Sequence, residues 1–287
     1  MKRITLAALL ILAACTEQPE GEPLVVSNLD GTPAESAAPT AAASAAAPTG
    51  PSACKAVTFE GVPLTHCTAD PALHAIQMAN LGADKQPFGS LSAFAASVDP
   101  ATIAFAVNGG MYGDDLKPIG YFVQNGERLK ELNRAEGDGN FYMKPNGVFF
   151  GTGGKWQVLG SNTFFNTVGE RPAFGTQSGP LLLVDGKLHP EIQDDGPSKA
   201  VRNGVGVDAG GRAHFVISDA PVSFGQLARY FRDVVKVSNA LYLDGQVSSL
   251  WDPATARMDK GRVGPIIVVT KREAKPAAPA TAQAGTP

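Results

Sequence analysis

The sequence predicts an α+β fold, with an antiparallel or mixed β-sheet core built from hairpins and a few packed helices. Two observations carry this prediction. Short apolar runs alternate with turn signals through the middle of the chain, and only one clear amphipathic helix interrupts them. Thirty-two glycines and twenty-two prolines among 287 residues are typical of a loop-rich fold rather than a helical bundle.

The first elements of the predicted fold are a short helix and a strand. A helix is expected over residues 90–98, where Asp99-Pro100 ends it. The run "TIAFAVNGG" then alternates in a strand-like pattern until it breaks at two glycines. One face of this strand is expected to carry Ile103, Phe105 and Val107.

Four hairpins follow along the chain. Their segments are "PIGYFVQNGERL", "GVFFGTGGKWQVL", "GPLLLVDGKL" and "GVGVDAGGRAHFVIS". Asn125-Gly126 and Asp185-Gly186 are two-residue turns of the kind that favours hairpins, because Asn, Asp and Gly tolerate positive φ. The pattern therefore predicts antiparallel pairs rather than a doubly wound parallel sheet.

The clearest helix follows the fourth hairpin. Ser223 with Gln226 three residues later forms a capping-box pattern at its start. One apolar face is then expected from Phe224, Leu227, Phe231 and Val234. Beyond the helix, "NALYLDGQVSSL" is a short apolar run that delivers Asp244 into a turn at Gly245.

The two ends of the chain predict export and tethering rather than folding. Two basic residues precede the apolar run "ITLAALLILAA", which is too short to span a membrane as a mature helix and leads to Cys15. This arrangement resembles the lipobox of bacterial lipoproteins, which implies a signal peptide over 1–14 and lipid on the Cys15 thiol. Ala/Pro/Ser/Thr-rich composition predicts a disordered tether at 15–53 and a disordered tail at 273–287, around one domain at 54–272.

The alternative to a lipoprotein is an ordinary secretory signal followed by an incidental cysteine. If the lipobox is used, Thr16 in place of Asp after Cys15 favours the outer membrane, facing the periplasm. The formal net charge of −3 and the lack of a basic cluster argue against nucleic acid as a partner. Membrane contact is expected only through the lipidated cysteine, and the sequence leaves the oligomeric state open.

The remaining cysteines, Cys54 and Cys67, are expected to form a disulfide, because an exported chain with an even pair sits in an oxidising compartment. Closing so short a loop contributes about 3 kcal/mol on the chain-entropy model. The four histidines are scattered without metal-ligand spacing, so neither a metal nor a cofactor is expected.

Polar residues collect where the predicted apolar strands begin or end. Each one alone is compatible with a turn former or a solvated charge. Together they form the candidate site: Asn108, Gly109, Gly110, Lys144, Asn146, Ser178, Gly179, Arg202, Asp219, Asp244, Ser248 and Ser249.

Six segments that contain these residues resemble, in order, the phosphodiester glycosidase family of uncovering-enzyme-like domains. They are "NGGMYGDDLKPIGYFVQNG", "NFYMKPNGVFF", "TQSGPLLLVDGKLHP", "RNGVGVD", "ISDAPVSFGQLARYFRD" and "NALYLDGQVSSL". The resemblance covers roughly residues 101–269 and is closest to the bacterial branch of the family. It implies hydrolysis of sugar-1-phosphodiesters, for which envelope or exopolysaccharide glycans would be a source.

The residue types fit a substrate with one negative charge. Arg202 offers a planar fork for phosphate oxygens, and Lys144 offers a point charge. Backbone N–H groups at the glycines can approach an oxyanion because no side chain blocks them. The remaining candidates are neutral donors for sugar hydroxyls or phosphate: Asn108, Asn146, Ser178, Ser248 and Ser249.

Two carboxylates complete the candidate site. Asp244 is expected to act as base or nucleophile with Asp219 assisting, since a carboxylate pair is the usual equipment for glycoside hydrolysis. Both have simpler interpretations: Asp244 as a turn residue, and Asp219 as part of the electrostatics of the following helix. The sequence leaves open whether the C–O or the P–O bond is cleaved. It also leaves open a non-catalytic module that binds glycans or cell-wall polymers.

Overall fold

The computed structural model describes residues 50–244 and 247–272. The expected signal peptide, Cys15 and the tail lie outside the described residues, as does Gly245. The regular structure begins at Cys54 and ends at Lys271. None of the helices in the described part of the chain is long and apolar enough to cross a membrane.

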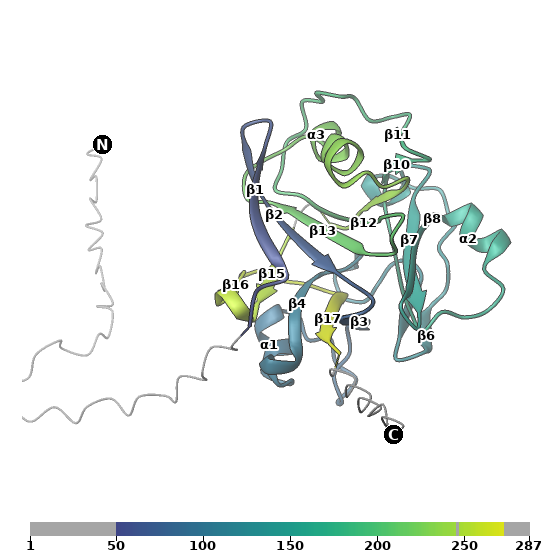
Figure 1. Cartoon of the computed structure of the whole chain (residues 1–287). Helices are drawn as coiled ribbons and strands as arrows, with labels where there is room; N and C mark the ends of the chain where they lie inside the picture. Colours follow the sequence, from purple (N-terminus) through teal and green to yellow (C-terminus); the bar gives the residue numbers. More distant parts are fainter. Residues whose placement is uncertain (1–49, 245–246, 273–287) are drawn as a thin grey trace, which may run out of the picture. The chain divides into compact units, whose positions relative to one another are not determined.

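Three sheets make up the domain (Figure 1), and the strands that neighbour each other within them pair antiparallel. The first sheet has seven strands in the order β1 (Cys54–Phe59), β2 (Val62–Ala69), β13 (Ala213–Ser218), β12 (Asn203–Val207), β14 (Ala240–Tyr242), β10 (Leu181–Val184) and β11 (Lys187–Leu188). The second has five, in the order β16 (Arg257–Met258), β15 (Leu250–Asp252), β4 (Ile103–Asn108), β17 (Ile266–Lys271) and β3 (His74–Ala79). The third has five, in the order β6 (Glu127–Lys130), β5 (Phe122–Gln124), β9 (Phe174–Ser178), β7 (Gly147–Thr152) and β8 (Lys155–Gly160).

Helices are few and short, which confirms the α+β prediction. The α-helices are α1 (Leu91–Ala95), α2 (Ser161–Thr167) and α3 (Phe224–Arg229). A π-helical segment, Tyr230–Val235, continues α3 directly. Single turns of 3₁₀-helix cover Pro100–Thr102, Asn140–Tyr142 and Pro253–Thr255.

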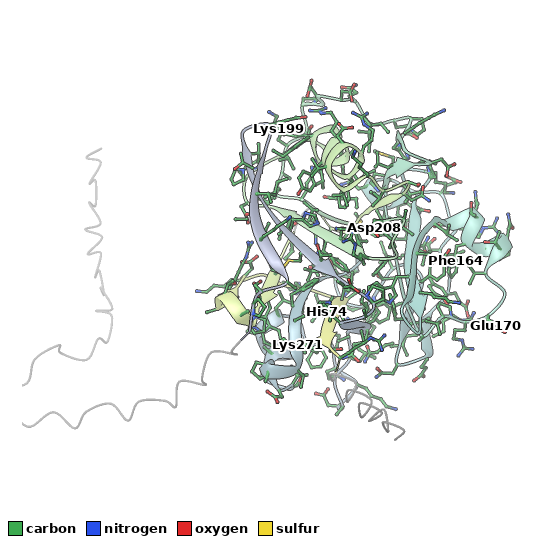
Figure 2. The ribbon with its side chains drawn as sticks, viewed as in Figure 1. His74, Phe164, Glu170, Lys199, Asp208 and Lys271 are labelled. Atoms are coloured by element: carbon green, nitrogen blue, oxygen red, sulfur yellow. A yellow bond between two sulfur atoms is a disulfide. The ribbon has the colours of Figure 1, made fainter. Side chains whose placement is uncertain are left out.

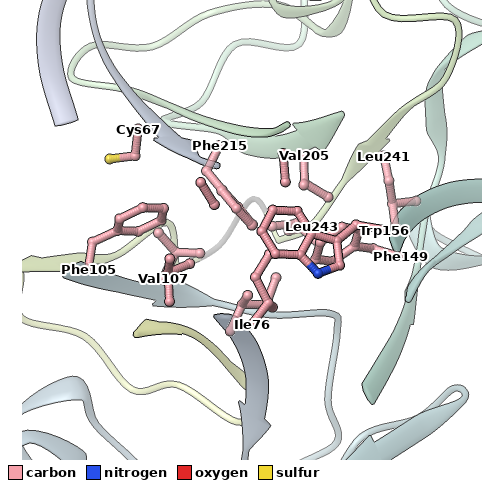
Figure 3. Packing of buried hydrophobic residues seen from close by; sticks show 14 of the residues in the cluster. Cys67, Ile76, Phe105, Val107, Phe149, Trp156, Val205, Phe215, Leu241 and Leu243 are labelled. Carbon is pink, nitrogen blue, oxygen red and sulfur yellow. The ribbon is translucent and has the colours of Figure 1, made fainter. Parts of the chain in front are cut away.

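All three sheets contribute to one apolar core. Phe215 from the first sheet, Phe105 from the second and Phe149 from the third are fully or almost fully buried in the same cluster, and Figure 3 shows these rings close together. The opposite faces are covered by helices: α3 packs on the first sheet, α1 on the second and α2 on the third. Each sheet is therefore fixed between the common core and one helix.

The predicted hairpins are confirmed at their turns. β5–β6 reverses through Asn125 and Gly126, which have φ of 53° and 75°, and β10–β11 reverses through Asp185 and Gly186 at 48° and 78°. Positive φ at both central residues is the requirement of the hairpin turn that the sequence predicted. The Cys54–Cys67 disulfide is also confirmed, and it joins directly paired residues of β1 and β2.

Two packing details differ from the sequence prediction. β4 is buried on both faces, and Ile103 does not share a face with Phe105 and Val107: it packs in the cluster under α1, because the pairing with β17 shifts register at this point. Val234, expected on the apolar face of the long helix, is 50% exposed. The helix changes to a π-helix after Arg229, and the wider turn rotates later residues off the α-helical face. Ser223 caps the helix as predicted, accepting a hydrogen bond from the Gln226 N–H.

A buried polar chain crosses the first sheet beneath the π-helix. Tyr230 Oη lies 2.9 Å from His66 Nδ1, and His66 Nε2 lies 2.9 Å from His214 Nδ1. His214 Nε2 lies 3.1 Å from the carboxylate of Asp208. Asp208, labelled in Figure 2, directly follows β12. A protonated imidazole at His66 or His214 would be a buried charge with little access to water, so the neutral forms are favoured.

The pKa values in this chain follow that burial. Burial, the neighbouring His214 and the charge of Lys55 lower the pKa of His66 from 6.5 to about 4. Burial also lowers the pKa of His214, against the opposing effect of Asp208. For Asp208, burial acts to raise the pKa, but hydrogen bonds from His214 and Arg212 outweigh it and lower the pKa to about 2.

We expect the domain to lose stability as pH falls from 6.5 to 4. In this window the unfolded chain binds protons at His66 and the folded chain does not, so the free energy of unfolding rises with pH. The contribution of His66 is fully present above pH 6.5. A shift of this size corresponds to roughly 3 kcal/mol. Urea unfolding at several pH values measures it, and His66→Gln should flatten the slope by about one proton. An equally steep slope in His66→Gln would contradict the assignment.

Candidate active site

Ends of strands from all three sheets meet at one place in the fold. Asn108 ends β4 of the second sheet, and Ser178 ends β9 of the third. In the first sheet, Asn203 begins β12 and Asp244 follows two residues after β14. All four are at least nine-tenths buried. The polar residues predicted at separate strand ends thus come from different sheets to a shared position.

A pair of asparagines joins the first two sheets and fixes the backbone around Asp244. Asn203 Nδ2 donates to Asn108 Oδ1 at 2.8 Å. Asn108 Oδ1 also accepts from the Ser249 N–H at 2.9 Å, and Asn203 Oδ1 accepts from the Asp244 N–H at 3.2 Å. The two asparagine side chains therefore fix the backbone at Asp244 and at Ser249, on both sides of the segment between them.

The predicted serines reinforce the same region. Ser178 Oγ donates to the Leu243 carbonyl at 2.5 Å, which ties the third sheet to the residue before Asp244. Ser248 Oγ lies 3.0 Å from the Asp244 carbonyl and 3.2 Å from that of Val201. The Ser249 hydroxyl is buried and makes no hydrogen bond within the described residues.

The predicted glycines allow close packing between sheets. The Gly109 N–H donates to the Pro265 carbonyl at 2.7 Å, and the Gly110 N–H donates to Thr176 Oγ1 at 3.1 Å. Both N–H groups are thus engaged inside the protein rather than directed at an oxyanion. A Cβ on Gly110 would lie 2.2 Å from the Gln177 carbonyl oxygen, so only glycine fits there. Gly179 is equally crowded, with the Asn146 Cβ 2.7 Å from such a Cβ.

A cleft of about 590 Å³ opens beside Asp244, and we call it the Asp244 cleft. Its walls are the segment after β4, the 3₁₀ turn Asn140–Tyr142 and the segment before β17. The lining residues are Met111, Tyr112, Gly113, Asp114, Ile119, Asp138, Gly139, Asn140, Phe141, Tyr142, Asp244, Val247 and Arg262. The cleft therefore offers carboxylates, one guanidinium, a phenol and an amide to a ligand.

Asp244 affects the ionisation of two tyrosines. Burial raises the pKa of Tyr112, the negative charge of Asp244 raises it further, and Arg262 opposes both. Tyr112 Oη donates to the Arg262 carbonyl at 2.5 Å, which fixes the phenol against the cleft wall. Burial also raises the pKa of Tyr242 to about 12, where Arg202 opposes the effect and Asp244 adds to it. Both phenols are therefore neutral donors at physiological pH.

Comparison with known proteins identifies the family of this chain. A family model described as phosphodiester glycosidase matches residues 101–270, which is more than half of the 287 residues. The chain belongs to the phosphodiester glycosidase family. The matched residues include every strand end that meets at Asp244.

This chain is similar to one curated protein by sequence and to several solved structures. The uncharacterized protein YigE of Escherichia coli (strain K12) is 32% identical over 185 residues, covering 64% of this chain and 72% of YigE. The zebrafish N-acetylglucosamine-1-phosphodiester alpha-N-acetylglucosaminidase catalytic domain aligns with a TM-score of 0.53 at 13% identity, over 76% of this chain and 82% of that one. A putative exported protein of Burkholderia pseudomallei K96243 aligns with a TM-score of 0.45 at 13% identity, over 72% and 74% of the two chains. The zebrafish likeness establishes the fold.

Arg202 is not part of the lining of the Asp244 cleft. It is 3% exposed, and its guanidinium stacks 3.7 Å from the ring centroid of Phe224. Nε donates to the Val222 carbonyl at 3.0 Å, Nη1 to Tyr242 Oη at 3.1 Å, and Nη2 to Ser198 Oγ at 3.0 Å. This environment differs from the predicted phosphate-binding role, because all three guanidinium nitrogens are engaged within the protein.

Lys144 and Asn146 line a different, smaller hollow of about 170 Å³. Lys144 Nζ forms a close ion pair with Glu136 and donates to the Arg134 carbonyl at 3.2 Å. Asn146 is buried, and its Nδ2 donates to the Phe141 carbonyl at 2.8 Å. Neither residue lines the Asp244 cleft, so the predicted lysine does not supply that cleft with its cation.

Asp219 is part of an ion-pair network on the other side of β12. Its carboxylate lies 2.9 Å from Arg257 Nη1 and accepts from Thr65 Oγ1 at 2.8 Å. β12 stands between β13 and β14, the strands that lead to Asp219 and Asp244. Two strand spacings put the two backbones roughly 10 Å apart, and Asp219 does not line the Asp244 cleft.

Three residues at or beside the cleft were not among the sequence candidates. Tyr112 stands inside the segment "NGGMYG", in which Gly109 and Gly110 were the predicted site residues beside Asn108. Asn203 follows Arg202 directly, and a strand-start asparagine had a signal equal to that of Asn108. Arg262 had no signal of its own, because it lies outside the six motifs, in the irregular segment between β16 and β17. Within the described residues, no group of three or more His, Cys, Asp or Glu side chains is arranged to hold a metal ion.

Proposed function

We propose that the protein is an exported hydrolase that cleaves glycosyl phosphodiesters in the Asp244 cleft. One observation carries the proposal: the carboxylate of Asp244 and the guanidinium of Arg262 line the same cleft in a chain of the phosphodiester glycosidase family. A carboxylate beside a cation matches a substrate in which a sugar carbon is joined to an anionic phosphate.

The proposed reaction is hydrolysis at the sugar C1–O bond. Water attacks C1 and its proton passes to the Asp244 carboxylate, while the C1–O electron pair leaves on the phosphate oxygen. The products are the free sugar and a phosphomonoester. Arg262 neutralises the charge that grows on the leaving phosphate, and a leaving group of this kind needs a cation more than it needs a proton.

The supporting residues act through position. Asn108 and Asn203 hold the backbone at Asp244 and Ser249, so the carboxylate is presented from a rigid strand end. Asp219 and Arg202 contribute by stabilising the neighbouring strands: Asp219 pairs with Arg257, and Arg202 donates to Tyr242. Among cleft residues, Asp138 and Asp114 are the carboxylates available for a second role.

We infer export and lipid anchoring from the N-terminal sequence alone. The basic start, the apolar run and Cys15 support a lipoprotein signal. Fractionation of cells that produce the full chain checks this: the wild-type protein should sediment with membranes, and Cys15→Ser should not. A wild-type protein in the soluble fraction would overturn the anchoring.

Turnover in H₂¹⁸O tests both the activity and the bond. The substrates are methyl diesters of α- and β-linked N-acetylglucosamine, glucose and mannose 1-phosphates, each incubated with and without chelator. We expect ¹⁸O in the released sugar from at least one substrate, which means C1–O cleavage. ¹⁸O in the phosphate would contradict the proposed bond. Binding of these diesters with no turnover would favour the non-catalytic glycan-binding module.

A further inference from the structure

The Asp244 cleft has a charge balance that is unfavourable for a lone phosphodiester. Its lining carries three carboxylates, from Asp114, Asp138 and Asp244, and one guanidinium, from Arg262. Arg262 also donates through Nη2 to the Asp114 carbonyl at 3.0 Å, which keeps it at that wall. A substrate anion inside this cleft meets a formal charge of −2 from these four groups, so cationic side chains next to the cleft would strengthen its binding.

A second hollow of about 590 Å³ adjoins the cleft. The two hollows share Ile119 and Tyr142 in their linings. The hairpin closed by the Tyr112–Pro118 bridge lies between them. Residues 112–114 of this hairpin line the cleft, whereas Asp115, Lys117 and Pro118 line the second hollow. The shared residues show that the two hollows are adjacent, with Tyr142 at the junction.

The second hollow has the opposite charge balance. Lys117 and Lys130 line it, together with a single carboxylate, Asp115. Lys117 Nζ and Asp115 lie 3.9 Å apart with side chains that are 59% and 62% exposed, so this pair is weak and Lys117 is available to a ligand. Lys130 ends the exposed edge strand β6 and takes part in no ion pair within residues 50–244 and 247–272.

The floor of this hollow is rigid, which suits a binding site. Asn80 Nδ2 donates to the Leu116 carbonyl at 2.8 Å, and Asn133 Nδ2 donates to the Ile119 carbonyl at 3.0 Å. Both amides line the hollow and tie the hairpin to neighbouring segments. The two lysines line the same hollow as these amides, and Tyr142 offers an aromatic face for a sugar ring at the junction.

We propose that this second hollow, the lysine subsite, binds a further phosphodiester of a longer substrate. The substrate class is a glycan whose sugar units are joined to one another through phosphodiesters, so that one phosphodiester lies at Asp244 while the next is held by Lys117 and Lys130. The position of the cleaved bond rests on the proposed function, whereas polyanion binding at the lysine subsite does not. This arrangement adds cationic side chains to the attraction that Arg262 alone provides in the acidic cleft.

Isothermal titration calorimetry on Asp244→Asn protein tests the subsite without interference from turnover. The probes are a phosphodiester-linked trimer of N-acetylglucosamine 1-phosphate, the methyl diester of the monomer, and trigalacturonate as a carboxylate-bearing glycan. We expect the trimer to bind roughly tenfold more tightly than the monomer, and the Lys117→Gln/Lys130→Gln double variant to lose that advantage with the monomer Kd unchanged. Lys155→Gln/Lys187→Gln, which removes two exposed lysines outside both hollows, serves as the matched control.

Each other outcome has a defined meaning. Equal affinity for trimer and monomer, an equal loss in the control variant, or failure of the trimer to bind overturns the subsite. Trigalacturonate that binds as tightly as the trimer overturns the phosphodiester assignment. Trimer binding that depends on the lysines, with no turnover by wild-type protein, supports the subsite while the proposed function fails. Turnover of the monomer by wild-type protein, with a trimer Kd that does not change in the Lys117→Gln/Lys130→Gln variant, supports the proposed function and overturns the subsite.

Discussion

Asp244→Asn should reduce turnover of a glycosyl phosphodiester by about 10²–10⁴-fold while the protein still unfolds cooperatively. The amide has nearly the shape of the carboxylate but cannot accept a proton from attacking water, and losses of this size are typical when an acid–base group is removed. The Asp244 N–H bond to Asn203 is unaffected by the substitution. Steady-state kinetics together with thermal unfolding of the same preparation measure the two properties.

Asp219→Asn is the matched control for Asp244→Asn. Asp219 is bound to Arg257 and Thr65 outside the cleft, so its loss should lower stability by at most about 1 kcal/mol and leave turnover within a few-fold of wild type. Arg257 keeps a second partner in Asp259. Wild-type turnover in Asp244→Asn, or a larger loss of turnover in Asp219→Asn, would refute the assignment of the reacting carboxylate.

Arg202→Met should destabilise the domain by about 3–5 kcal/mol. The substitution removes a buried guanidinium whose three nitrogens serve Val222, Tyr242 and Ser198, and it leaves those groups without their donor. The methionine side chain keeps much of the packing against Phe224, so the loss is one of hydrogen bonds and charge rather than of volume. Urea unfolding monitored by circular dichroism gives the free energy directly.

Arg171→Met provides the comparison on the surface. Arg171 is exposed, and its one hydrogen bond within the described residues is a long one of 3.4 Å to the Gly126 carbonyl. Its substitution should change stability by less than about 0.5 kcal/mol. If Arg202 instead binds phosphate, Arg202→Met would raise KM at nearly unchanged stability, and that result would restore the role the sequence predicted for it.

Local chemistry accounts for what the sequence predicted well. Asn125-Gly126 and Asp185-Gly186 specify their hairpins because both turns require residues that accept positive φ. Ser223 specifies a helix start for a similarly local reason. The position of Asp244 at a strand end was visible in the same way, from an apolar run followed by a carboxylate.

The predictions that depended on distant contacts were less complete. Val234 was placed by α-helical spacing, and the change to a π-helix after Arg229 rotates it into solvent. Arg202 and Arg262 are indistinguishable as residue types, yet one stacks under Phe224 and the other lines the cleft. Which arginine faces a ligand is decided by the packing of three sheets, and no short segment contains that information.

The meeting of three sheets at Asn108, Ser178 and Asp244 has a practical consequence for finding the substrate. No single hairpin can hold the cleft open by itself, so a ligand that fills it binds only the fully assembled domain. Such a ligand stabilises the whole domain by about 2.7 kcal/mol at a concentration one hundred times its Kd. The melting temperature of the protein is therefore a reporter of cleft occupancy, and a library of anionic glycans can be ranked by it before any product is known.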